Sequence, residues 1–288
     1  MNKLYSKIFA LTLMLTGSSC QEKASSDIDT VFGEAELVFV GPDNDAPIST
    51  KKALGALYYR LDDGDLSYNF SPHCTAFKIS VDKIITAAHC IKNNGMNLFY
   101  RSSYFASSDA ILQFTHTGII KATSSESYED ITVQQVIHIS NHQDIAVLKL
   151  IKDSLSCIRY SEDVFVHEKN AVLLSFPQGQ PLAKSTNCTL TSKGYHDCDS
   201  LSGSSGGAIL DQNYQLLGIH IKGYDTNDLK WYEKEQRFET QAEIVARICS
   251  FQSECIAELS PRSYNRALLL SDLDPTIKDH WQCLTKDK

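Results

Sequence analysis

The chain of 288 residues lacks an excess of basic residues and lacks a long apolar run. It carries 27 Lys and Arg against 35 Asp and Glu, for a formal net charge of -8, which argues against a nucleic-acid binder with a clustered basic face. The apolar run at residues 8–15 is too short to span a bilayer. No helical period lasts beyond two turns before residues 241–251, and no internal repeat or low-complexity block is present.

The N-terminal residues have the pattern of a secretory signal. Lys3 and Lys7 precede the apolar run, which ends in the small residues TGSSC, so we expect a signal peptide over residues 1–19. LTGSSC resembles the signals of bacterial lipoproteins, in which the cysteine, here Cys20, becomes the lipidated first residue. Ordinary signal-peptidase cleavage nearby is the alternative. Residues 20–30 are polar and are expected to form a tether. The mature protein is thus expected as a lipoprotein at the bacterial envelope, or as a periplasmic or secreted protein.

The rest of the chain consists of short apolar runs separated by turn residues. The runs include ELVFVG, GALYYRLDD, AFKISVDKIITAA, ITVQQVIHI, IAVLKL, AVLLSF and YQLLGIHIKG, and the turns include PDND, DDGD, KNNG, PQGQP and SKG. Short strands at this spacing predict an all-β sandwich or barrel rather than alternating βαβ units.

Residues 201–210, LSGSSGGAIL, surround two serines with three glycines and fit two serine chemistries. A serine hydroxyl needs a histidine to take its proton and a carboxylate to orient that histidine. In the α/β-hydrolase elbow, a helix follows the serine and the Asp and His come later. Here AILDQNYQLLGIHIKG follows Gly207 and has the pattern of a β-hairpin, and the preceding YHDCDSLS is no buried parallel strand. The elbow is therefore rejected.

The partners lie upstream instead. TAAHC at residues 86–90, DIAVLKL at 144–150 and GSSGG at 203–207 occur in the order His, Asp, Ser. Together they resemble the trypsin-like serine peptidases of chymotrypsin fold, nearest the bacterial branch that includes glutamyl endopeptidases. The resemblance covers about residues 53–223. It implies an all-β domain over residues 31–288, with two six-stranded antiparallel β-barrels at about 50–160 and 165–250 and a C-terminal extension, 251–288, containing a helix and a tail.

The resemblance also assigns catalytic roles. It implies His89 as general base and then general acid, Asp144 as the residue that orients the imidazole, and Ser205 as the nucleophile, because the family pattern G-x-S-G-G places the serine before the glycine pair. The backbone N–H groups of Gly203 and Ser205 would form the oxyanion hole. Asp130 in YEDITV is a rival carboxylate, but Asp144 matches the motif because an apolar strand follows it at once.

The family builds its specificity pocket from the segments that correspond here to CDSLSGSS and GIHIKG. Asp199 would favour a basic substrate residue. Ser200 and His220 resemble the glutamyl branch, and Lys222 beside Gly223 would add positive potential, so an acidic residue is the favoured prediction. Ser204 stands where many members carry an aspartate that pairs with a newly formed N-terminus, which argues against that activation switch. VFGE at residues 31–34 resembles the start of bacterial members, so trimming nearby stays open.

Eight cysteines besides Cys20 suit four disulfides in an exported chain. The resemblance implies Cys74–Cys90 beside the histidine. Of the 105 connectivities open to eight cysteines, we favour those that also join close neighbours, Cys188–Cys198 and Cys249–Cys255, and leave Cys157–Cys283 to tie the tail. A metal site at Cys188, His196 and Cys198 is the alternative to the second pair.

The sequence therefore predicts a monomeric serine endopeptidase that hydrolyses a protein or peptide substrate through an acyl-enzyme. It needs no cofactor and no metal, binds no nucleic acid and touches a membrane only through the N-terminal lipid. The alternative is a catalytically silent binding protein with a protease fold at the cell surface.

Overall fold

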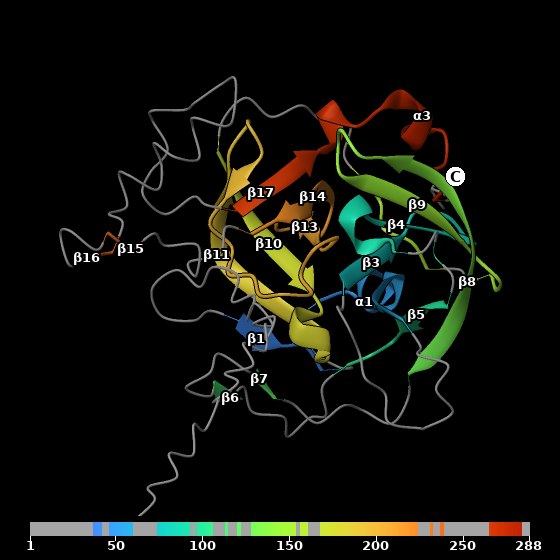
Figure 1. Ribbon diagram of the computed structural model, residues 1–288, viewed down its shortest axis with the longest axis horizontal. Coiled ribbons are helices and arrows are strands. Elements are labelled where there is room, and N and C mark those ends of the chain that lie inside the picture. The colour runs from blue at the N-terminus through green and yellow to red at the C-terminus, as the bar shows by residue number, and fades with distance from the viewer. Residues whose placement is uncertain are drawn as a thin grey trace, which may run out of the picture.

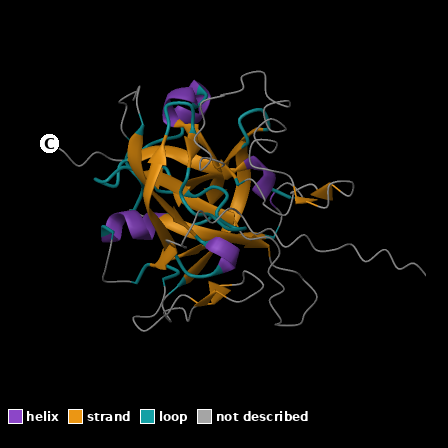
Figure 2. Ribbon diagram, turned by 90° about the vertical axis from the view of Figure 1, so that its left-hand side faces the viewer, coloured by secondary structure: helices purple, strands orange, loops and turns teal. Residues whose placement is uncertain are grey.

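The strands form two β-barrels that lie side by side, with short helices at their edges (Figures 1 and 2). The computed structural model describes residues 37–41, 46–59, 74–92, 95, 97–105, 113–114, 120–121, 128–153, 156–160, 168–223, 231–232, 237–238 and 265–283. The all-β prediction of two six-stranded antiparallel barrels is confirmed.

The first barrel is closed and antiparallel. Its strands, in hydrogen-bonded order, are β2 (Leu54–Tyr59), β3 (Cys74–Lys78), β4 (Lys83–Ala87), β9 (Ile145–Leu150), β8 (Glu129–Ser140) and β5 (Leu98–Ser102), which pairs with β2 again. The apolar run of β9 is buried almost throughout, whereas the first half of β8 alternates between buried and exposed positions. Because β4 and β9 pair with Ala87 opposite Ile145, the residues at the adjoining strand ends, His89 and Asp144, are brought together.

The second barrel is built in the same way. Its strands, in order, are β11 (Ala183–Leu190), β10 (Lys169–Ser175), β13 (Ala208–Leu210), β14 (Leu216–Lys222), β17 (Asn265–Leu269) and β12 (Tyr195–His196). The pair Leu190–His196 closes it, and β1 (Leu37–Phe39) adds to the outer side of β11. The hairpin predicted after Gly207 is confirmed as β13–β14, with Asp211 Oδ1 accepting the N–H of Asn213 and of Gln215 at its turn.

Two strands of the second barrel were not recognised in the sequence. The second barrel was expected to end near residue 250, but it takes β17 from the segment expected as a C-terminal extension. A five-residue strand inside a polar sequence carries little periodicity, and pairing with β14 and β12 makes this segment a strand. Strand β11, AKSTNCTL, was also missed, because its outward positions are polar.

Beyond β17 the chain crosses back to the first barrel. It runs through η5 (Leu270–Asp272) and α3 (Pro275–Lys278), whose first turn is capped by the Asp274 carboxylate. The N–H of Gln282 then donates to Ile79 O over 2.9 Å, and Trp281 Nε1 donates to Ile158 O over 3.1 Å. The tail therefore packs against the first barrel, in agreement with the expected Cys157–Cys283 tie.

One apolar core joins the two barrels. It contains Phe77 and Ile85 from the first barrel and Leu174 and Ile219 from the second, all with 0% exposure. The remaining short elements are α1 (Ile48–Ala53), η1 (Ala88–Cys90), η3 (Pro177–Gly179), β6 (Gln113–Phe114), β7 (Ile120–Lys121), β15 (Trp231–Tyr232) and β16 (Arg237–Phe238).

Three of the expected disulfides are present: Cys74–Cys90, Cys157–Cys283 and Cys188–Cys198. The fourth pair, Cys249 and Cys255, lies outside the described residues, as do the signal peptide, the tether, Cys20, residues 31–34 and the helix expected at 241–251. Among the residues that the structure describes, no helix is long and apolar enough to cross a membrane.

Candidate active site

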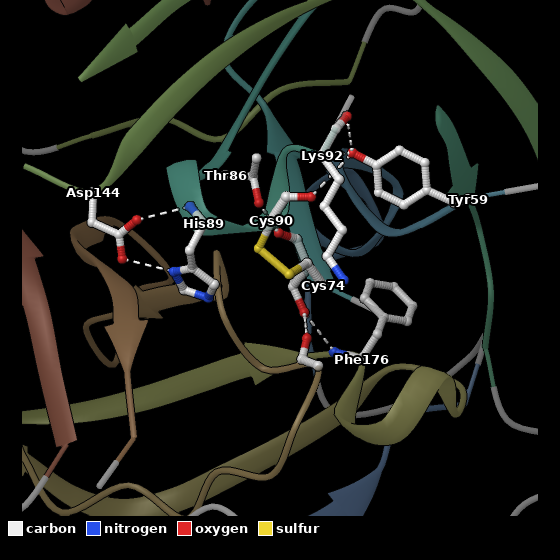
Figure 3. The surroundings of a disulfide bond; sticks show 10 residues. Tyr59, Cys74, Thr86, His89, Cys90, Lys92, Asp144 and Phe176 are labelled. Atoms are coloured by element: carbon white, nitrogen blue, oxygen red, sulfur yellow. Dashed lines mark hydrogen bonds and ion pairs between the residues drawn. A yellow bond between two sulfur atoms is a disulfide. The ribbon is translucent and has the colours of Figure 1, made fainter. Parts of the chain in front are cut away.

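His89 and Asp144 form a hydrogen-bonded pair at the rim of the first barrel (Figure 3). The His89 Nδ1 and Asp144 Oδ2 atoms are 2.7 Å apart, and the backbone N–H of His89 donates to Asp144 Oδ1 over 2.9 Å. An ionised carboxylate only accepts hydrogen bonds, so Nδ1 carries the proton and Nε2 of the neutral ring is an acceptor. The side chain of His89 is 49% exposed, which leaves Nε2 available to a reacting group.

Asp144 owes its place to an unusual backbone conformation. It lies in the turn between β8 and β9 with φ at 55°, a left-handed conformation that aspartate tolerates better than most residues. Its carbonyl accepts the N–H of Ala88 over 2.9 Å, which fixes the turn against η1. Both backbone and side chain of Asp144 are therefore bound to the segment that carries His89.

Asp130, the rival carboxylate, is engaged elsewhere. Its Oδ1 accepts Arg101 Nε over 2.8 Å and its Oδ2 accepts Arg101 Nη2 over 3.1 Å. A bidentate pair of this kind occupies both oxygens. The structure therefore places Asp144, and not Asp130, against His89.

The loop that carries Ser205 is held by its own backbone. The N–H of Ser204 donates to Leu201 O, that of Gly206 to His220 O and that of Gly207 to Ser204 O, over 2.7–2.8 Å. In the described part of the chain, the N–H groups of Gly203 and Ser205 donate to no acceptor. Both predicted oxyanion donors are thus among the N–H groups that the described loop leaves without an acceptor.

Gly206 shows why this loop needs glycine. Its φ is 83°, and an added Cβ would lie 2.0 Å from Thr75 O and 2.4 Å from Thr86 Oγ1. A side chain at this position would therefore push the loop away from the first barrel. Gly203 also has a positive φ, 94°, which a residue without a Cβ adopts at little cost.

Ser205 faces the first barrel through its main chain. Its carbonyl accepts the N–H of Thr75 over 2.8 Å, and Thr75 follows Cys74, whose disulfide partner Cys90 follows His89. Within the described residues, no hydrogen bond joins Ser205 Oγ to His89 Nε2. Such nucleophile–base contacts are often long in the absence of substrate and tighten when it binds.

His220 and a second histidine are buried behind the loop. His220 Nδ1 and His196 Nε2 lie 2.9 Å apart, and both residues have 0% exposure. Burial, and after it the electrostatic effect of His89, lowers the pKa of His220 to about 3. Burial, with the electrostatic effect of His220, lowers the pKa of His196 well below its ordinary value. The pair is therefore uncharged at neutral pH.

Several polar atoms around this pair are buried without a partner. Asn265 lies opposite His196 in the β12–β17 pairing and donates from Nδ2 to Cys198 O over 2.6 Å. Of the described buried atoms, those without a hydrogen bond include His220 Nε2, His196 Nδ1, Asn265 Oδ1 and Ser200 Oγ. Unpaired buried polar groups are costly. Three of these residues, His196, His220 and Asn265, lie together, which indicates a site that a polar group completes.

The comparison with known families establishes the family of this chain. A family model described as a trypsin-like peptidase domain matches residues 74–219, half of the chain. The chain belongs to the trypsin-like peptidase family. A search of curated proteins finds no match.

Solved structures similar to this trypsin-like peptidase share little sequence with it. A serine endoprotease from Yersinia pestis is 16% identical, with 62% of this chain and 60% of that one covered and a TM-score of 0.43. The Rv3671c protease of M. tuberculosis, in an inactive form, is 14% identical over 71% and 91% of the two chains, with the same TM-score, 0.43. A Glu endopeptidase in complex with MPD is 20% identical over 69% and 89%, again at 0.43.

The remaining residues predicted for the specificity pocket of this trypsin-like peptidase lie in the second barrel. Asp199 is buried and its N–H donates to Ser185 Oγ over 2.9 Å. Lys222 ends β14 and is exposed, and Gly223 follows it, partly buried. Cys188 and Cys198 are bonded to each other, so the metal alternative at His196 is rejected.

Sequence reasoning missed the place of His196 and Asn265 in this site. His196 lies on a two-residue strand, and Asn265 lies 60 positions beyond Ser205 in a segment without a motif. Only the closure of the second barrel brings His196 next to His220 and Asn265 opposite His196, and no local sequence pattern predicts these contacts.

Proposed function

We propose that this trypsin-like peptidase is a serine endopeptidase with Ser205 as nucleophile and His89 as general base. The observation that carries the proposal is the His89–Asp144 pair, in which one carboxylate binds both Nδ1 and the backbone N–H of the histidine. This arrangement fixes the tautomer and leaves Nε2 as the acceptor that a serine hydroxyl requires.

The proposed reaction proceeds in two halves. Ser205 Oγ attacks the substrate carbonyl carbon while His89 Nε2 takes its proton, and the resulting oxyanion accepts hydrogen bonds from the N–H groups of Gly203 and Ser205. His89 then gives the proton to the leaving amine, which departs and leaves an acyl-enzyme. In the second half, water attacks the carbonyl carbon of the ester while His89 Nε2 takes its proton. His89 then returns the proton to Ser205 Oγ as the acid product leaves. Asp144 stabilises the imidazolium without itself taking the proton.

A fluorophosphonate probe tests the proposed nucleophile. We expect the folded protein to react with the probe, which gives up its fluoride to form a phosphonyl ester, and peptide fragmentation to place the adduct on Ser205 rather than Ser204. Heat-denatured protein is the control and should stay unlabelled, because activation depends on the folded triad. An unlabelled folded protein would support the alternative of a silent binding protein.

We further propose that the enzyme cleaves after an acidic residue. The support is the set of buried, unpaired polar atoms at His220 and Ser200, together with the exposed ammonium of Lys222 at the end of the same strand. A carboxylate that enters a buried site needs a compensating positive charge. Protonation of the His220–His196 pair supplies it. Asp199, which would favour a basic residue, is the competing determinant.

The pH dependence of selectivity is expected to reveal this proton. Because the pKa of His220 is about 3 in the free protein, binding a carboxylate at neutral pH takes up a proton, whereas binding its amide isostere does not. The ratio of kcat/KM for a Glu peptide to that for the matched Gln peptide should therefore fall as pH rises, by at most about tenfold per pH unit for one proton. Effects of pH that act on both peptides alike cancel in this ratio.

The same peptide series tests the competing determinant. Peptides with Glu, Gln and Arg before the scissile bond are compared at fixed pH. Cleavage after Arg with none after Glu would reject the role of His220 and favour Asp199. If the Glu-to-Gln ratio of kcat/KM stays constant with pH, proton uptake on binding is rejected. The size of that ratio at fixed pH still measures the preference for an acidic residue.

Export to an oxidising compartment is also proposed. Its support is the presence of three disulfides, since such bonds persist outside the reducing cytosol. The N-terminal signal and lipidation at Cys20 stay predictions from the sequence.

A further inference from the structure

Thr75 connects the first barrel to the loop of Ser205 through two of its three polar atoms, its backbone N–H and its hydroxyl. It is buried with 0% exposure. Its N–H donates to Ser205 O over 2.8 Å, and its hydroxyl donates to Gly203 O over 2.9 Å. The same hydroxyl accepts the N–H of Phe176 over 2.9 Å, and Thr75 O accepts Thr86 Oγ1 over 2.7 Å. Figure 3 shows Phe176 and Thr86 on either side of the Cys74–Cys90 disulfide.

The direction of the Thr75 hydroxyl is determined by these contacts. A hydroxyl has one proton to donate and lone pairs to accept with. Because the N–H of Phe176 can only donate, and Gly203 O can only accept, the hydroxyl proton must lie toward Gly203. The hydrogen bond to the loop therefore has one possible polarity and does not alternate.

The carbonyl of Gly203 lies between the two oxyanion donors. A peptide unit is planar, so holding a C=O group also holds the N–H of the next residue on the opposite side. Ser202 O accepts the N–H of Gln178, which directs the N–H of Gly203 away from it. Ser204 O accepts the N–H of Gly207, which does the same for Ser205. The peptide between them is held at its N–H by Leu201 O, within the loop, and at Gly203 O by Thr75, from the first barrel.

Gly203 is the residue of this loop whose backbone needs an external restraint most, because it lacks a side chain. It has no side chain to limit rotation of the flanking peptides, and its φ of 94° is one of several that glycine adopts easily. The restraint on its carbonyl comes from a different barrel, and from the strand that the Cys74–Cys90 disulfide joins to the segment of His89. One residue thus relates the oxyanion loop to the general base.

We propose that Thr75 is a positioning residue, whose hydroxyl holds the Gly203 and Ser205 N–H groups in register with His89. This inference rests on the proposed function, because the direction of these groups matters only if Ser205 reacts. The competing interpretation is that the hydroxyl merely satisfies buried backbone groups between the barrels. If that interpretation holds, removing the Thr75 hydroxyl lowers the stability of the protein but does not specifically lower kcat.

Thr75→Val and Thr75→Ser separate the two interpretations. Valine keeps the shape of threonine and lacks the hydroxyl, so kcat is expected to fall about 10- to 100-fold, as small displacements of catalytic groups do, with KM nearly unchanged. Serine keeps the hydroxyl and should retain most of the wild-type kcat. Fluorophosphonate inactivation, which also builds charge at the oxyanion hole, should slow in parallel with kcat.

Tyr100→Phe is the matched control. Tyr100 also has 0% exposure in the first barrel, and its hydroxyl donates to a backbone carbonyl, Ala53 O, over 2.8 Å. Its removal should lower the urea midpoint of unfolding as Thr75→Val does, without lowering kcat. If valine prevents folding, Thr75→Ala replaces it with the same expected loss of kcat.

The outcomes distinguish this inference from the proposed function. A wild type that reacts with the probe, together with a folded Thr75→Val that keeps its kcat, would overturn the positioning role alone. So would a Thr75→Ser variant that loses as much kcat as Thr75→Val. A wild type that does not react at all would overturn both.

Discussion

Ser205→Ala is expected to lower kcat about a million-fold and Asp144→Asn about ten-thousand-fold. Alanine removes Oγ, the atom proposed to form the acyl-enzyme. Asparagine keeps the shape of Asp144 but presents an N–H₂ group, so it can no longer accept from both Nδ1 and the backbone N–H of His89. The imidazole then adopts the tautomer with a proton on Nε2, which cannot accept from serine. Hydrolysis of a chromogenic peptide at neutral pH measures both losses.

Asp130→Asn is the matched control for Asp144→Asn. It changes the same atoms in the rival carboxylate, which binds Arg101 instead of His89. Arg101 also lies over the rings of Tyr58 and Tyr128, 4.7 and 4.2 Å from their centroids. Loss of its partner is expected to cost up to about 3 kcal/mol of unfolding free energy, with kcat near wild type. Equal losses of kcat in both variants would contradict the assignment of Asp144.

Removing the Cys157–Cys283 disulfide is expected to lower the free energy of unfolding by about 5 kcal/mol, against about 3 kcal/mol for Cys188–Cys198. The physical reason is loop closure in the unfolded chain, since the first bond spans 126 residues and the second spans 10. The longer bond also fixes the tail that returns to the first barrel through Gln282 and Trp281. Urea unfolding of the two double Cys→Ala variants measures the difference.

The order of the two losses is the informative result. A larger loss for the short loop would contradict the chain-entropy explanation and would point to interactions of Cys188 and Cys198 in the folded barrel. Both variants keep the Cys74–Cys90 bond beside His89, so changes in kcat are not expected to accompany the changes in stability.

Much of the fold was predictable because its strands carry local signals. The runs that became β2, β3, β4 and β9 are apolar and bounded by turn residues, and the hairpin after Gly207 has an aspartate that accepts two backbone N–H groups at its turn. Strands β11 and β17 were not predictable in this way. The first is polar on its outward face and the second is short, so only pairing with neighbours from other parts of the chain makes them strands.

The sequence by itself determined the family, the two-barrel fold and the motifs at His89, Asp144 and Ser205, because each motif is short and its residue types follow from the chemistry. Through the family resemblance it also predicted that Ser204 stands where many members carry an aspartate. Only the tertiary structure decided which atoms these residues contact, since the contacts join strands far apart in the chain. It alone placed His196 beside His220 and Asn265 opposite His196. It alone showed that Thr75, a residue in no motif, forms hydrogen bonds from the barrel of His89 to the loop of Ser205.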